Sequence, residues 1–309
     1  MSNKKTITTF GGGVGAGKFL RGLYNFNKEF DLRFIVNTSD DIDIYDVRVS
    51  PDIDSVLYWI SGIVDKERGW GLKNDNFEMV NSNKSYWFNL GDKDLEYNKL
   101  KKKLLDQGLK LNEFIKIKMD QLEINNISIF PMTNDKVETY LNLDIGDAHI
   151  QEFLIKYKMK PKINDIKFRG IQDAKPLSEV LSSIESSDMI IFCPSNPFIS
   201  IDPIINLQGV RDQIEKSKAI KIAISPIVNG IAFQGPILKF FELNSLPPSV
   251  EGVAEYYKNL AQYIVIDKSD YDYKGKIEKI GLLPVFDNIK MVNDNVSINL
   301  ATTITKILY

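Results

Sequence analysis

The chain has 309 residues, enough for one large α/β domain with a sizeable core or for two smaller domains. Its formal net charge of −2 and its lack of long basic runs argue against a nucleic-acid-binding surface. A single cysteine, Cys193, excludes an intramolecular disulfide, and a single histidine, His149, argues against a Ser-His-Asp triad or a histidine-rich metal site. No apolar run is long enough to span a bilayer, so we expect a cytoplasmic protein without a membrane partner.

A glycine-rich stretch follows the first predicted strand, Thr6–Phe10. Five glycines occupy the seven positions 11–17, and a helical pattern with Phe19 and Leu20 on one face comes next. Glycines let the backbone approach a ligand closely, and a helix N-terminus presents free N–H groups to an anion. A plain strand-to-helix turn would need only one glycine. The stretch therefore predicts a phosphate-binding loop.

The type of loop is less clear from the motif itself. Residues 12–18 fit the pattern G-x-x-x-x-G-K, but Phe19 stands where a P-loop needs a hydroxyl to hold magnesium. The dinucleotide fingerprint is also imperfect, because Ala16 takes the place of its third glycine. The motif alone indicates a nucleotide or a phosphate ester.

An acidic segment, residues 37–54, follows the second predicted strand, Asp31–Val36. It begins at the carboxyl end of that strand, where open α/β sheets bind ligands, and clustered carboxylates together with phosphates are typical magnesium ligands. Asp40 and Asp41 are our candidate metal ligands because they lie closest to the strand end. A helix is predicted from Ser50-Pro51 onward, and its capping would explain one acidic residue but not the whole run. The aspartates are Asp40, Asp41, Asp43, Asp46, Asp52 and Asp54.

Residues 65–98 mix aromatic side chains with Asn, Asp and Gly. Such a segment could form a ligand wall or an ordinary packed loop, and the sequence favours neither. Helices are predicted at 95–107 and 111–122, with the basic cluster Lys99 and Lys101 to Lys103 on a solvated helix face. Strand-like runs at 127–131, 137–143 and 152–158 then predict a helical and mixed insertion over about residues 65–175.

The second half alternates strands and helices. The alternation predicts a single α/β domain over residues 1–309, with a Rossmann-like, doubly wound and mainly parallel sheet that carries the insertion. Small polar residues follow two of its strands, at Cys193–Phe198 and Ser225–Gly230. The predicted helices are 177–184, 209–216, 249–262 and 296–308, and the predicted strands are 188–192, 219–224 and 263–267.

Several blocks together resemble the 2-phospho-L-lactate transferase family, in order from the N-terminus to about Asp267. They are FGGGVGAGKFLRGL, VNTSDDIDIYDVRVSPDIDSVLYWISG, RGWGLKNDNF, FNLGDKD, CPSNPFISIDPI, ISPIVNGIAFQGP and SVEGVAEYY. The resemblance implies transfer of a 2-phospholactyl or phosphoenolpyruvyl-type group from a guanosine diphosphate ester to 8-hydroxy-5-deazariboflavin, with release of GMP. It also implies a magnesium-dependent enzyme of coenzyme F(420) biosynthesis and a homodimer.

The resemblance also implies roles for individual residues. The deazaflavin acceptor would contact Asp54 and Lys93, and Trp70 belongs to the aromatic segment that its site would need. Asp54 and Asp41 would be the catalytic carboxylates. The insertion would form part of this acceptor site. The guanosine diphosphate would bind Gly12, Gly13, Gly15, Lys18, Ser195, Asn196, Asn229 and Gly235, with Mg²⁺ on Asp40 and Asp41.

Two positions depart from the family pattern: Val14, where Thr is common, and Gly17, where Pro is common. Loss of a hydroxyl at Val14 would weaken a phosphate contact and leaves the exact donor open. The alternative is a non-enzymatic, nucleotide-sugar-binding regulatory protein of a related family with a similar glycine loop and a similar Asp-Asp block. The block Leu90–Asp94 and the aromatic segment after Trp70 favour the transferase, because a deazaflavin site needs them.

Overall fold

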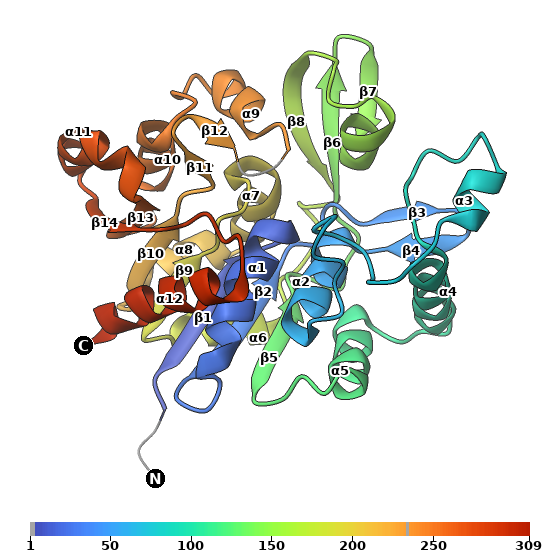
Figure 1. The fold of residues 1–309 in the computed structure, drawn as a ribbon, viewed down its shortest axis with the longest axis horizontal. Coiled ribbons are helices and arrows are strands. Elements are labelled where there is room, and N and C mark those ends of the chain that lie inside the picture. Colours follow the sequence, from blue (N-terminus) through green and yellow to red (C-terminus); the bar gives the residue numbers. More distant parts are fainter. Residues whose placement is uncertain (1–3, 233–234) are drawn as a thin grey trace.

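A parallel sheet forms the centre of the computed structural model, which describes residues 4–232 and 235–309. Within these residues seven strands pair in the order β14-β13-β10-β9-β1-β2-β5, and every pairing is parallel (Figure 1). The chain moves outward from β1 in one direction and then returns to build the other half, which confirms the doubly wound, Rossmann-like prediction. The strands are β1 (Thr6–Gly11), β2 (Asp31–Val36), β5 (Ile127–Pro131), β9 (Met189–Phe192), β10 (Ile220–Ile224), β13 (Tyr263–Asp267) and β14 (Leu283–Asp287).

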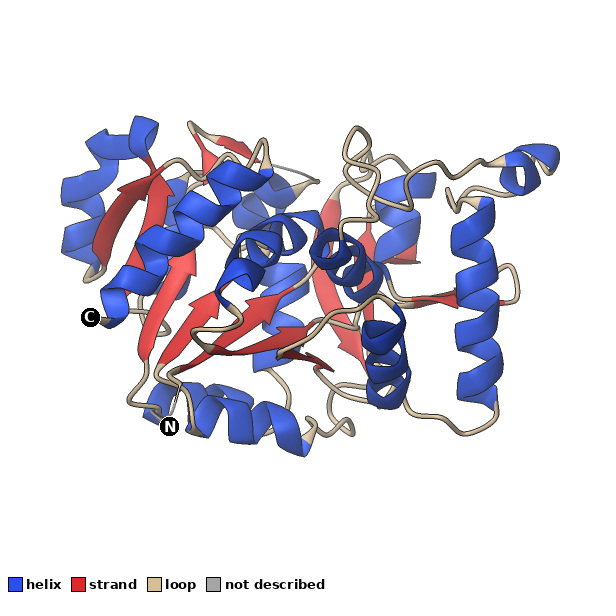
Figure 2. Cartoon of the chain, turned by 60° about the horizontal axis from the view of Figure 1, so that its bottom comes forward, coloured by secondary structure: helices blue, strands red, loops and turns tan. Residues whose placement is uncertain are grey.

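Helices cover both faces of this sheet (Figure 2). The strands are apolar on both faces, as buried parallel strands must be: in β9, Ile191 joins one apolar cluster and Ile190 joins the other. The first cluster includes α1 (Gly13–Leu23), α2 (Pro51–Ser61), α5 (Leu111–Gln121) and α12 (Asp294–Thr305). The second includes α6 (Ser178–Glu185), α7 (Asp202–Ile205), α8 (Val210–Lys216), α9 (Ile237–Leu243), α10 (Val250–Tyr257) and α11 (Lys274–Ile280).

The segment between about residues 65 and 175 supplies β5 to the central sheet and otherwise extends away from it (Figures 1 and 2). A third apolar cluster joins the hairpin of β3 (Ile42–Ile44) and β4 (Val47–Val49) to the aromatic segment, through Val47, Phe88 and Leu95 among others. The segment from 65 to 175 also contains the helices α3 (Glu78–Ser82) and α4 (Asp92–Asp106) and the antiparallel sheet of β7 (Gly146–His149), β6 (Glu138–Leu143) and β8 (Ile163–Arg169).

The predicted strand 152–158 is wrong, because residues Glu152–Lys156 form a π-helix. Lys156 donates a hydrogen bond to Glu152 at 2.9 Å, an i, i+4 pair that favours a helix over a strand. Strands β8 and β14 are the longest of the strands that were not predicted. β14 contains Pro284, which confines a strand to a sheet edge, and β14 is indeed the edge strand.

The remaining strands, β11 (Ile227–Val228) and β12 (Ile231–Ala232), form a short hairpin beyond β10. Short 3₁₀ segments extend several helices, and a second π-helix, Pro197–Ile201, follows β9. Across the described residues, each helix is too short or too polar to cross a membrane.

Candidate functional site

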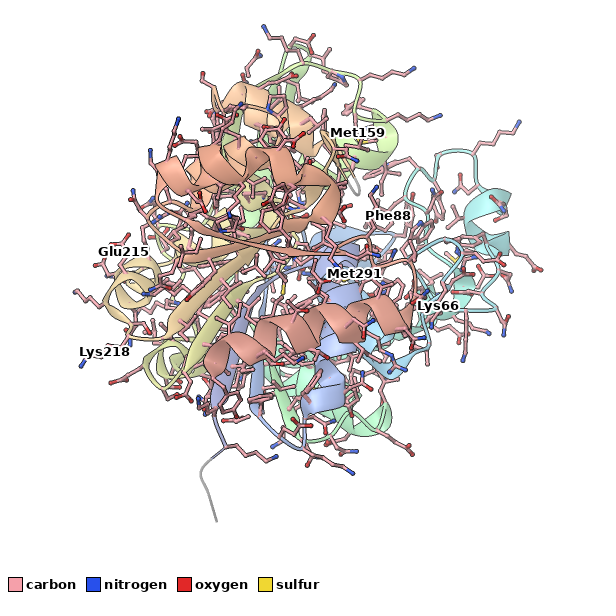
Figure 3. The ribbon with its side chains drawn as sticks, turned by 60° about the vertical axis from the view of Figure 1, so that its left-hand side comes forward. Lys66, Phe88, Met159, Glu215, Lys218 and Met291 are labelled. Carbon is pink, nitrogen blue, oxygen red and sulfur yellow. The ribbon has the colours of Figure 1, made fainter. Side chains whose placement is uncertain are left out.

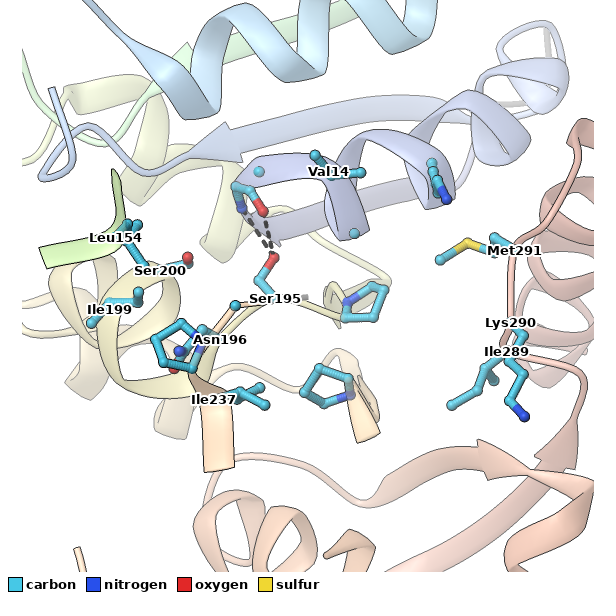
Figure 4. Close-up of a pocket in the computed structure, with 18 of the residues that line it drawn as sticks. Val14, Leu154, Ser195, Asn196, Ile199, Ser200, Ile237, Ile289, Lys290 and Met291 are labelled. Atoms are coloured by element: carbon cyan, nitrogen blue, oxygen red, sulfur yellow. Dashed lines mark hydrogen bonds between the residues drawn. The ribbon is translucent and has the colours of Figure 1, made fainter. Parts of the chain in front are cut away.

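The carboxyl ends of β1 and β9 lie at one edge of the sheet. The glycine-rich loop follows β1 there, and the loop Cys193–Phe198 follows β9. The connections from these two neighbouring strands run to opposite sides, which creates the crevice where parallel sheets bind ligands. The Ser195 hydroxyl, just beyond β9, accepts a hydrogen bond from the Gly12 N–H at 3.1 Å and donates one to the Gly12 carbonyl at 2.9 Å (Figure 4). The structure thus joins two segments that the sequence assigns to one nucleotide site.

The glycines of the first loop let it pack closely against other parts of the protein. A Cβ atom on Gly12 would overlap the Asp52 carboxylate, and one on Gly15 would overlap the Pro194 carbonyl oxygen. Gly13 has a φ of 71°, a backbone conformation that side chains rarely adopt. The glycine pattern therefore holds the β1 loop against α2 and the β9 loop and leaves the N-terminus of α1 open.

A cavity of about 410 Å³ lies in front of that N-terminus. Helix α1 has no side-chain cap and no acidic residue in its first turn, so its free N–H groups and positive dipole end suit an anion. Lys18 adds a cation to the lining, and burial lowers the pKa of its ammonium. Ile289, Lys290 and Met291 line the side opposite Asn196 (Figure 4).

A second cavity of about 610 Å³ adjoins the first and shares Gly13, Val14, Leu154 and Gly235 with it. The aromatic segment supplies much of its wall, including Trp70 and Phe88, which favours a ligand-wall role for these side chains over ordinary loop packing. Met159, from a later part of the insertion, also lines this cavity; Figure 3 labels both Phe88 and Met159. The polar lining includes Asp40, Asp52, Asp54, Asp94 and Asn98.

Asp40 and Asp52 are held together beside the junction of the two cavities. The Asn37 amide donates to Asp52 at 2.9 Å and to Asp40 at 3.4 Å, and no cation pairs with either carboxylate among the described residues. Burial raises the pKa of Asp52 to about 7. The pKa of Asp40 is raised well above its usual value, chiefly by burial and then by the charge of Asp52. Such a pair favours either a proton or a bound cation.

Asp41 is not among the described residues that line either cavity. Its carboxylate accepts from the Ser50 hydroxyl at 2.8 Å and lies 3.4 Å from Arg48, and burial raises its pKa to about 6. The helix begins at Pro51 as predicted, but Ser50 bonds Asp41 and does not cap α2 with its side chain. The structure thus pairs Asp40 with Asp52, and not with Asp41. Within the described residues, no three acidic, histidine or cysteine side chains are arranged to hold a metal ion by themselves.

Two further carboxylates lie deeper in the second cavity. Asp54 accepts from Lys101 at 3.0 Å, and Lys101 is fully buried, so the predicted solvated face is wrong for this lysine. Asp94 accepts from the Tyr58 hydroxyl, and burial raises its pKa to about 7. Sequence reasoning placed Asp94 in the acceptor-site block Leu90–Asp94 without giving it a role, and it did not assign Asn98 or Lys101 to the site. Their spacing of four and three residues, which places all three on one face of α4, was the available signal.

The other predicted residues fall in two groups. Ser195, Asn196 and Gly235 line the first cavity, as Gly12, Gly13, Gly15 and Lys18 do. Lys93 and Asn229 are not among the described residues that line either cavity. The Lys93 ammonium donates to the Asn74 carbonyl at 2.8 Å, and the exposed Asn229 donates its backbone N–H to Asp270 at 3.1 Å.

Comparisons with known proteins show which family the chain resembles over its length and which solved structure shares its fold. The family model described as 2-phospho-L-lactate transferase CofD matches residues 7–290. A 2-phospho-L-lactate transferase of Methanothermobacter thermautotrophicus is 35% identical over 284 residues, which cover 91% of this chain and 90% of that protein. A 2-phospho-L-lactate transferase of Methanococcoides burtonii is 33% identical over 302 residues, which cover 96% of this chain and 98% of that protein. A crystal structure of a UPF0052 family member from Bacillus halodurans has the same fold, with a TM-score of 0.68 and 18% identity over 99% of this chain and 100% of that one.

Proposed function

Because the chain belongs to the 2-phospho-L-lactate transferase CofD family, we propose that it moves a 2-phospholactyl or phosphoenolpyruvyl-type group from a guanosine diphosphate ester to 8-hydroxy-5-deazariboflavin. GMP leaves, and the product belongs to coenzyme F(420) biosynthesis. The match over residues 7–290 is the observation that carries the proposal. The two adjoining cavities support it, since group transfer needs a donor and an acceptor side by side.

In this proposal the guanosine diphosphate part of the donor occupies the 410 Å³ cavity. Its phosphates lie at the N-terminus of α1, where the uncapped N–H groups face them and Lys18 adds a positive charge. Ser195 fixes the Gly12 peptide in the loop by its two hydrogen bonds. The nucleoside part then lies between Asn196 and the segment from Ile289 to Met291.

Asp40 and Asp52 fit a magnesium ion better than Asp40 and Asp41, because both carboxylates line the cavity next to the phosphates. Magnesium takes one or two protein carboxylates and fills its other positions with phosphate oxygens and water. Asp40 and Asp52 are two buried carboxylates, and among the described residues no third acidic, histidine or cysteine side chain is arranged with them to hold a metal. They therefore match the small number of protein ligands that magnesium takes. When bound, the ion supplies positive charge to the diphosphate. Asn37 keeps the two carboxylates adjacent.

The deazaflavin acceptor occupies the 610 Å³ cavity, with its ring against Trp70 and Phe88. A terminal ribityl hydroxyl, oriented by Asp54, attacks the phosphorus that bears the lactyl group. The new P–O bond forms as the P–O bond to GMP breaks, and Asp54 accepts the proton of the hydroxyl. Catalysis of this kind depends mostly on positioning and charge neutralisation.

The direct test is incubation of the protein with deazariboflavin, the guanosine-linked donor and magnesium, followed by chromatography of GMP and of the deazaflavin. We expect GMP and a deazaflavin that carries the phospholactyl or phosphoenolpyruvyl-type group to appear in equal amounts, and only when both substrates are present. Tight nucleotide binding with no GMP release would instead fit the nucleotide-sugar-binding alternative. Release of GMP at the same rate without the acceptor would mean hydrolysis and would contradict the transfer proposal.

A further inference from the structure

Lys101 is a lysine with no exposed surface, on α4 behind the second cavity. We propose that it is a positioning residue, whose ammonium holds the Asp54 carboxylate in place at the cavity floor. The proposal rests on the proposed transferase function, because it concerns how the acceptor hydroxyl is oriented. Lys101 itself is not among the described residues that line the cavity, whereas Asp54 is.

The geometry places Lys101 directly behind Asp54. Its Nζ atom lies 3.2 Å from one Asp54 oxygen and 3.0 Å from the other, so the ammonium holds both. The Ser50 backbone N–H donates to one of these oxygens at 3.3 Å. The Tyr97 ring covers the ammonium from another side, with its centroid 5.3 Å away. Asp54 therefore cannot turn away from the cavity without losing its partners.

Stability alone does not explain this pair. Taking an ammonium and a carboxylate out of water is costly, and a buried ion pair can often be replaced by apolar residues with no loss of stability. The neighbouring Lys102 reaches the surface, where it pairs with Asp106. Only the lysine that faces Asp54 is buried among Lys101, Lys102 and Lys103. A buried charge whose partner lines a substrate cavity is better explained by the site than by the fold.

A second observation on the same face of α4 points to a ligand. Asn98 is 1% exposed and lines the second cavity, and its amide oxygen has no hydrogen-bond partner among the described residues. Its amide nitrogen donates to the Asp94 carbonyl at 2.8 Å, which fixes the orientation of the side chain. Buried acceptors without partners are costly, and a ligand that donates would satisfy this one. The cavity floor thus offers acceptors, from Asp54 and Asn98, to the hydroxyls of a polyol chain.

The test is a double-mutant cycle between Lys101→Met and Asp54→Asn, with Lys103→Met as the control. Lys103 is exposed on the same helix, so its substitution should leave kcat and both substrate affinities unchanged. Lys101→Met should lower kcat on the order of 100-fold, the cost of misplacing a reacting group, and should leave GDP affinity by calorimetry unchanged. Because Lys101 acts through Asp54, the double variant should be no slower than Asp54→Asn alone.

The double variant also guards against misfolding, because it removes both buried charges together and leaves neither unpaired. Multiplicative losses of kcat in the double variant would overturn the inference, and so would a Lys101→Met variant with the kinetics of Lys103→Met. A wild-type protein that neither shifts deazaflavin fluorescence nor releases GMP would refute the proposed function, and this inference would fall with it. An active wild type with an unaffected Lys101→Met variant would refute the inference alone.

Discussion

Replacement of Asp52 by Asn should make the metal-free protein more stable at pH 8 while removing its activity. Asp52 is 6% exposed, and burial raises its pKa from 3.8 to about 7. In the unfolded chain the same carboxyl has a pKa near 4. Between these two values the folded protein retains a proton that the unfolded chain has released. Its free energy of unfolding therefore falls by about 1.4 kcal/mol for each unit of rising pH.

The magnitude follows from the width of that interval. The stabilising contribution of protonated Asp52 is fully present below pH 4 and is lost as the pH rises through 7, a loss of about 4 kcal/mol. An amide in place of the carboxyl still accepts the Asn37 N–H, 2.9 Å away in the wild type, and has no proton to lose. Asp52→Asn should therefore match the wild type near pH 4 and exceed it by up to about 4 kcal/mol at pH 8.

Urea unfolding in EDTA at several pH values between 4 and 8 measures this difference. Asp46→Asn is the matched control: Asp46 belongs to the same acidic run but is exposed, and its φ of 58° in the β3–β4 turn suits Asn equally well. The control should follow the wild type at every pH. Parallel curves for the wild type and Asp52→Asn would refute the reasoning. With magnesium and GDP present, the wild type should gain stability at pH 8 and Asp52→Asn should gain much less.

Three other substitutions or modifications give separate tests. Gly15→Ala should lower the free energy of unfolding, measured in urea, by about 1–3 kcal/mol and weaken GDP binding, because its methyl group would overlap the Pro194 carbonyl. Gly275→Ala is the control, because a methyl group there enters open space and should change the stability little. Trp70→Ala should raise the acceptor KM about tenfold, the loss of one aromatic contact, and leave GDP affinity unchanged; equal loss of both affinities would contradict its place in the second cavity. Burial raises the pKa of Cys193 to about 12, so iodoacetamide should label it at pH 8 only after unfolding, and rapid labelling of the native protein would contradict that burial.

The doubly wound, parallel architecture and the glycine-rich turn between the first strand and the first helix could be predicted from sequence because their signals are local. Strand and helix periods alternate along the chain, and right-handed connections leave few ways to arrange parallel strands. The glycine loop after β1 and the Ser195 loop after β9 both follow buried apolar strands, so both had to reach the same sheet edge. The adjacency of Gly12 and Ser195 follows from that topology.

The pairing of the aspartates could not be predicted, because it depends on a hairpin. Residues 42–49 fold out as β3 and β4, with Ile42 opposite Val49, and this register places Asp41 beside Ser50. The chain then returns to the sheet edge with Asp52 next to Asp40, twelve positions away in the sequence. We chose Asp40 and Asp41 as metal ligands because they lie closest to the strand end. That criterion does not indicate which later residue the chain brings back beside Asp40.

Lys101 was missed for a different reason. A run of lysines on a helix is ordinarily solvated, and the partner that makes burial possible, Asp54, lies on another helix. Periodicity could have shown that Asp94, Asn98 and Lys101 share a face of α4. Only the tertiary structure shows that this face is buried against α2 and the second cavity.

A crystal structure of the protein with GDP, magnesium and deazariboflavin would test the assignment of the two cavities most directly. We predict the diphosphate at the N-terminus of α1, the metal on Asp40 and Asp52, and the deazaflavin ring between Trp70 and Phe88, with its ribityl chain toward Asp54. A diphosphate bound away from the Gly12–Gly15 loop, or a deazaflavin ring in the first cavity, would contradict the account.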